Sequence, residues 1–130
     1  MIGIDTNVLV RYLAQDDPVQ SVEATRFIES LTTHEPGFIS VVAMAKTAWV
    51  LDRAYGLTTS EIAAAIEHVL QAEVLIVESE QEVFTSMIVL KEGRSSFADA
   101  LIGALGAKAG CWHTVTFDRK ASRISGFKTL

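Results

Sequence analysis

The sequence predicts an α/β fold in which a short parallel sheet of four to five strands lies between layers of helices. Short apolar runs alternate along the chain with longer segments whose apolar residues recur at helical spacing. Strands separated by helices pair in parallel and need cover on both faces, which predicts a three-layer α/β/α arrangement. The predicted strands are residues 2–4, 37–39, 74–77, 112–117 and, at an edge, 127–130.

Capping and stop residues predict where the helices begin and end. Ser, Thr and Asp side chains cap the first turn of a helix, and glycine commonly ends the last. The predicted starts are Asp5, Asp17-Pro18, Ser40, the capping-box pairs Thr58/Glu61 and Ser79/Glu82, and Ser96; the predicted stops are Gly56, Gly93 and Gly110.

Composition indicates a single domain, residues 1–130, in a reducing compartment. Apolar residues make up 49% of the chain, enough for a substantial core. The single cysteine, Cys111, excludes an intramolecular disulfide, and no Cys/His cluster has zinc spacing. No signal peptide or membrane-spanning stretch is evident, so we expect a cytoplasmic protein that does not bind membranes.

Charge is unevenly distributed along the chain. Residues 1–90 carry four basic and thirteen acidic side chains, whereas residues 91–130 carry seven basic and three acidic ones, within a net charge of −5. The basic third could attract phosphates, and an ordinary solvated imbalance is about equally compatible with the pattern.

Three aspartates are expected to lie close together at one edge of the predicted sheet. Asp5 follows the first strand, Asp118 follows the fourth, and Asp99 opens the helix that leads into that fourth strand. Each has a simpler interpretation as a helix cap or capping-box residue. Polar sites collect at the carboxyl ends of parallel strands, however, and three carboxylates in one crevice would repel unless a divalent cation lay between them. An all-oxygen site favours Mg²⁺ or Mn²⁺.

The helix that carries Asp99 is apolar or small on every side, which predicts a buried helix. Its two interior glycines, Gly103 and Gly106, each cost about 1 kcal/mol relative to alanine. We expect another segment of the chain to pack closely against them.

Four blocks, in order, resemble PIN-domain nucleases. They are Ile4-Asp5-Thr6-Asn7-Val8-Leu9-Val10, Phe38-Ile39-Ser40 leading to Trp49-Val50-Leu51, Phe97-Ala98-Asp99-Ala100-Leu101-Ile102, and Thr116-Phe117-Asp118-Arg119. The resemblance covers nearly the whole chain, whose length is similar to that of VapC-type toxins of bacterial toxin–antitoxin pairs.

This resemblance implies a Mg²⁺-dependent endoribonuclease that is silenced by a cognate antitoxin and commonly forms a homodimer. Asp5, Asp99 and Asp118 match the family's catalytic, metal-binding acids. Asn7, Ser40 and Thr116 match the supporting polar positions of the family. The candidates for binding RNA phosphates are the basic residues Lys91, Arg94, Arg119 and Lys120.

One position departs from the family pattern. The family usually has a glutamate in the segment Ala45-Lys46-Thr47, and Lys46 stands at the expected acidic position. We expect Lys46 to point into the acidic cluster, to replace the metal in part and to impair cleavage. Two alternatives stay open: a catalytically dead PIN-fold module that binds an antitoxin, and an aspartate-dependent phosphatase or signalling receiver, which Asn7 and Thr6 disfavour because those classes need a second acid near Asp5.

Overall fold

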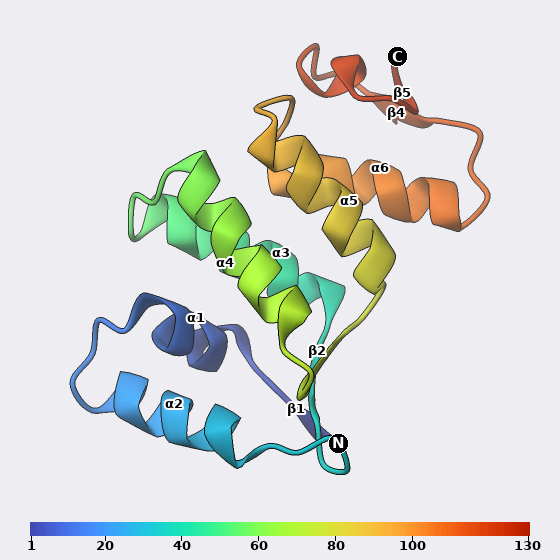
Figure 1. Cartoon of the computed structure of the whole chain (residues 1–130). Helices are drawn as coiled ribbons and strands as arrows, with labels where there is room; N and C mark the ends of the chain where they lie inside the picture. The colour runs from blue at the N-terminus through green and yellow to red at the C-terminus, as the bar shows by residue number, and fades with distance from the viewer.

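The computed structural model describes residues 1–130 and contains the predicted alternation of strands and helices (Figure 1). The fold is a three-layer α/β/α fold with few strands. Its elements are β1 (Ile2–Gly3), α1 (Thr6–Ala14), α2 (Gln20–Ser30), β2 (Gly37–Ile39), α3 (Val41–Arg53), α4 (Thr59–Gln71), β3 (Leu75–Val77), α5 (Glu80–Lys91), α6 (Phe97–Lys108), β4 (Thr114–Thr116), the 3-10 helix η1 (Ala121–Arg123) and β5 (Phe127–Thr129).

The five strands form two separate parallel sheets, whereas the sequence predicts one. Strands β1, β2 and β3 pair in that order, with Gly37 of β2 opposite both Ile2 of β1 and Leu75 of β3. Strands β4 and β5 pair only with each other. They lie beyond α6, at the opposite end of the molecule from β1 and the N-terminus (Figure 1).

Helix α6 provides the surface against which the second sheet packs. A Cβ added at Gly103 would collide with the ring of Phe127 in β5, and one added at Gly106 would lie 2.9 Å from Oγ1 of Thr114 in β4. The two glycines therefore allow the close approach that the sequence predicts. The prediction that α6 is buried on every side is wrong, because Ile102 is 55% exposed.

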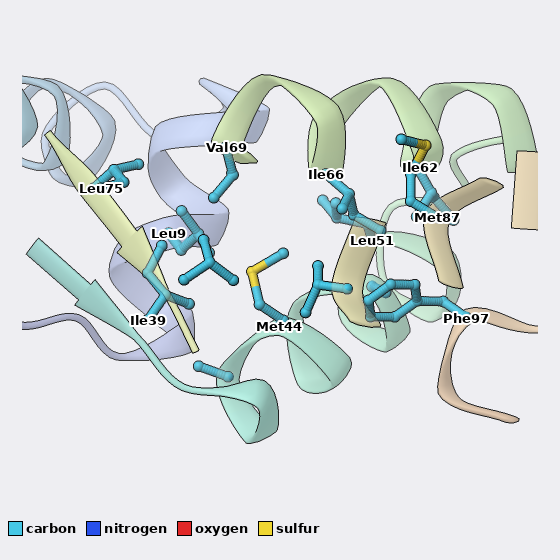
Figure 2. Packing of buried hydrophobic residues seen from close by; sticks show 14 of the residues in the cluster. Leu9, Ile39, Met44, Leu51, Ile62, Ile66, Val69, Leu75, Met87 and Phe97 are labelled. Carbon is cyan, nitrogen blue, oxygen red and sulfur yellow. The ribbon is translucent and has the colours of Figure 1, made fainter. Parts of the chain in front are cut away.

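The core lies between helices α1, α3, α4 and α5 and the face of strands β2 and β3 (Figure 2). Its fully buried members include Leu9, Ile39, Met44, Leu51 and Val69. Helix α3 contacts α1, α4 and α6, so its buried face connects the N-terminal and C-terminal parts of the chain. No helix is both long enough and apolar enough to cross a membrane.

Most of the predicted caps are confirmed. Oγ of Ser40 accepts a hydrogen bond from the backbone N–H of Ala43, and Thr58 and Glu61 form a reciprocal capping box. The predicted cap at Ser79 is wrong, since this residue has a left-handed backbone and its side chain accepts no capping hydrogen bond.

The second helix begins at Gln20, two residues later than Pro18. Oδ1 of Asp17 nevertheless accepts hydrogen bonds from the backbone N–H groups of Val19 and Gln20, at 2.9 and 2.7 Å. Hydrogen bonds from Gln20 and Val19 hold the pKa of Asp17 below its ordinary value.

We predict that the ionised carboxylate of Asp17 stabilises the folded protein more than its protonated form does. Since its pKa is lowered on folding, this contribution is present above the ordinary aspartate pKa and is lost as the pH falls through the lowered folded value. Asp17→Asn retains an acceptor without the charge. Thermal unfolding should therefore show a lower Tm for the variant at neutral pH and a difference that disappears in acid. A difference independent of pH would contradict this assignment.

We also predict that the sign of a Gly103→Ala substitution depends on Phe127. In the natural chain the new methyl group would collide with the aromatic ring, and overpacking of this kind costs about 1–3 kcal/mol. In a Phe127→Ala background the same change should stabilise the protein, because alanine is favoured over glycine within a helix by about 0.5–1 kcal/mol. Urea unfolding of the four chains measures both signs. Equal effects in the two backgrounds would show that β5 does not pack on α6 in this way.

Candidate functional site

A large hollow lies between α3, the start of α6 and the segment that follows β4. Its volume is about 770 Å³, and we refer to it as the main hollow. Apolar side chains such as Leu57, Ile62 and Phe97 line part of it. Its polar, charged and aromatic lining residues include Trp49, Asp52, Arg53, Arg94, Ser96, Asp99, Asp118, Lys120 and Arg123.

Asp99 lies in the first turn of α6, where Ser96 begins the helix. Oγ of Ser96 accepts a hydrogen bond from the backbone N–H of Asp99 at 3.1 Å, which places the side chain of Asp99 at the helix N-terminus. Asp99 is half-buried, and its carboxylate accepts no hydrogen bond and joins no ion pair within the chain. Both of its oxygens therefore remain available to a ligand or to water.

Asp118 reaches the main hollow from the end of β4. Its backbone N–H donates to Oγ1 of Thr116 at 3.0 Å, and its own Oδ1 accepts from the backbone N–H of Lys120 at 2.8 Å. Thr116 thus supports the turn that carries Asp118. The second oxygen of Asp118 has no partner in the chain.

Asp5 lies elsewhere. It lines a second hollow of about 490 Å³ together with Asn7, Arg11 and Glu23. Oδ1 of Asp5 accepts a hydrogen bond from the backbone N–H of Thr6 at 2.7 Å, and Asp5 is the N-cap of α1. The simpler interpretation of this residue as a helix cap therefore describes the contact that it makes.

The structure brings together two of the three predicted acids. Asp99 and Asp118 share the main hollow, whereas Asp5 does not line it. The physical reason is the pairing of the strands: β4 joins β5 on α6 and not β1, so the acids that follow β1 and β4 end at different places. No group of three acidic, histidine or cysteine side chains lies close enough to hold a metal ion.

Lys46 differs from its predicted placement. It is exposed on α3, joins no ion pair and does not line the main hollow, although its neighbour Ala45 does. The predicted contact between Lys46 and the three aspartates is therefore not formed. The buried residues of α3 include Met44, Thr47 and Leu51, and position 46 lies outside that buried face.

Two of the four predicted phosphate-binding residues line the main hollow. These are Arg94 and Lys120, whereas Lys91 and Arg119 do not line it. Ser40 acts as the cap of α3, and Asn7 accompanies Asp5 in the second hollow.

Sequence reasoning missed four further charged or aromatic members of the main hollow. They are Trp49, Asp52 and Arg53 on α3 and Arg123 in η1. The spacing of Trp49 and Arg53 is a signal that could have found two of them, because residues four apart in a helix lie on the same face. Arg123 offers no comparable signal, since its place depends on how η1 packs.

The comparison with protein families decides the identity of the fold. Residues 2–126 match the family described as PIN domain. The chain belongs to the PIN domain family. No curated protein and no solved structure matches the sequence. PIN domains are commonly metal-dependent nucleases.

PIN-domain nucleases usually use divalent metals, which raises the question of whether these residues fit one. Hard cations such as Mg²⁺ prefer several oxygen ligands in octahedral geometry. The main hollow offers the carboxylates of Asp99 and Asp118, and Asp52 lies on its α3 side. With Asp5 in another hollow and no group of three ligating side chains, the arrangement does not fit a tightly held metal.

We predict that Mn²⁺ binds this chain weakly and at the Asp99–Asp118 pair. Paramagnetic broadening of backbone amide signals should appear first around residues 96–99 and 118, and Asp99→Asn should remove it. Asp5→Asn is the matched control, because it removes the same charge from a different hollow. Broadening that is lost equally in Asp5→Asn would show that Asp5 reaches the same ion.

Proposed function

We propose that this PIN-domain chain is an endoribonuclease toxin of a type II toxin–antitoxin pair, with cleavage impaired by the composition of its site. One observation carries the proposal: Asp99 and Asp118 share an open hollow with Arg53, Arg94 and other cationic side chains. Cleavage of a phosphodiester needs groups that accept or donate protons and cations that bind the phosphate. Carboxylates and basic side chains in one hollow provide both.

The chain's own residues supply binding and proton handling. Arg53, Arg94, Lys120 and Arg123 can hold the phosphates of an RNA strand against the hollow. The unpartnered carboxylate of Asp99 can orient a water molecule for attack on phosphorus, and Asp118 can do so with its free oxygen. Asp99 and Asp118 are the residues that would hold a weakly bound divalent metal, and such an ion would supply positive charge beside the phosphate.

Two features support impairment. Lys46 stands where the resemblance to PIN-domain nucleases leads us to expect a glutamate, and Asp5 is separate from Asp99 and Asp118. The main hollow consequently lacks two of the carboxylates expected of such a nuclease. The proposed setting is the cytoplasm, with an RNA substrate, a cognate antitoxin and a second copy of the chain as partners.

The cleavage test compares single substitutions in the presence of Mg²⁺ and a single-stranded RNA labelled at one end. The natural chain should cleave slowly, and Asp99→Asn or Asp118→Asn should lower the rate by about 100-fold. Lys46→Glu should raise both the Mg²⁺ affinity and the rate by about tenfold, because it replaces a positive charge with a negative one next to Ala45, which lines the hollow. Lys128→Glu makes the same charge change on β5, away from the main hollow, and should have little effect.

A second candidate function is a binding module without nuclease activity. The observation in its favour is that no three ligating side chains lie together. Such a chain would still bind its antitoxin. If neither the natural chain nor Lys46→Glu cleaves RNA, and Asp99→Asn changes nothing, the binding module replaces the nuclease.

A further inference from the structure

The side chain of Trp49 suggests how the main hollow selects its ligand. Trp49 is 60% exposed, although burial of a large apolar side chain contributes about 1.5–3 kcal/mol. Isolated exposed apolar residues are ordinary, so exposure alone carries little weight. The surroundings of Trp49 are what distinguish it: this indole lines a hollow that also contains two candidate catalytic aspartates and four cations.

Arg53 lies over the indole ring of Trp49. Its guanidinium carbon lies 6.0 Å from the centroid of the Trp49 ring, one helical turn further along α3. Arg53 joins no ion pair, so its charge is free for the ring and for a ligand. An aromatic ring beside a guanidinium is a surface on which a nucleic-acid base can stack while the cation attracts the adjoining phosphate.

The charge of the main hollow favours an anionic strand. Four cations and three aspartates line it, which makes this hollow positive within a chain of net charge −5. Only Arg94 among the four cations is engaged in an ion pair, with Glu92 at 2.7 Å. The remaining three are exposed and unpaired, so they can exchange water for phosphate oxygens.

We propose that Trp49 is a base-stacking platform that holds one unpaired base of an RNA strand in the main hollow, with Arg53 beside it. This proposal rests on the proposed function and adds the residue that selects unpaired bases. A base inside a duplex has both faces covered by its neighbours, whereas an unpaired base can offer a face to the indole. The volume of about 770 Å³ lies within the range of small-ligand pockets.

The direct test uses the fluorescence of the full chain in a buffer with EDTA, so that binding is measured without cleavage. The chain has two tryptophans, Trp49 and Trp112. Trp112→Phe leaves Trp49 as the reporter, and Trp49→Phe leaves Trp112, which is 97% exposed and lines a different hollow. A short single-stranded oligoadenylate should quench Trp49 saturably and leave Trp112 unchanged. The same strand annealed to its complement should quench Trp49 much less.

Affinity provides the second readout. Trp49→Ala should weaken binding of the oligoadenylate by about 5- to 100-fold, which corresponds to the loss of one stacked base. Trp49→Phe should retain most of the affinity, because phenylalanine keeps an aromatic face, and Trp112→Ala is the matched control and should bind normally. Because Trp49 and Trp112 are exposed, none of these changes should alter folding, which far-ultraviolet circular dichroism checks.

Three results would overturn the proposal. They are equal affinity of the natural chain and Trp49→Ala, equal quenching of the two reporter chains, and quenching of Trp49 by an acidic peptide but not by RNA, which would assign the hollow to a protein segment. The proposed function has its own test, since loss of cleavage in Asp99→Asn beside normal binding by Trp49→Ala would retain the nuclease and remove the stacking role.

Discussion

The packing of α3 is the constraint on which the core and the candidate site both depend. Met44, Thr47 and Leu51 are buried on one face of this helix, and Trp49, Asp52 and Arg53 of the same helix line the main hollow. A shift of α3 would therefore move the hollow's wall together with the core. Ser40 caps the helix and Gly56, with a left-handed backbone, follows its end, so short-range signals define the segment that long-range packing then orients.

The second constraint is the approach of β4 and β5 to α6. Glycine at position 103 leaves room for the ring of Phe127, and this contact keeps the second sheet on α6. Asp118 follows β4 and Asp99 lies at the start of α6, so one packing contact brings these two acids to a common hollow. The position of the candidate site therefore depends on how β4 and β5 pack on α6 in the C-terminal part of the chain.

Helix caps and individual strands can be predicted from neighbouring residues in the sequence, whereas the pairing of distant strands cannot. The capping box at Thr58 and the strand 37–39 depend on neighbouring residues and were predicted correctly. Ser79 has capping-box spacing but takes a left-handed backbone, which spacing cannot reveal. The pairing of β4 with β5, which packs on α6 at Gly103, is a long-range contact, and it goes with the separation of Asp5 from Asp99 and Asp118.

The separation of Asp5 from Asp99 and Asp118 also reduces electrostatic repulsion between carboxylates. Three carboxylates in one crevice repel one another strongly unless a cation compensates them. In the described arrangement Asp5 accepts from the N–H of Thr6 and Asp118 from the N–H of Lys120, and each thereby gains a local donor without facing the other. Asp99 accepts no such hydrogen bond within the chain, so both of its carboxylate oxygens face the main hollow without a protein donor. The cations that line the same hollow, Arg53 and Lys120 among them, are therefore the protein charges with which Asp99 shares any ligand that enters.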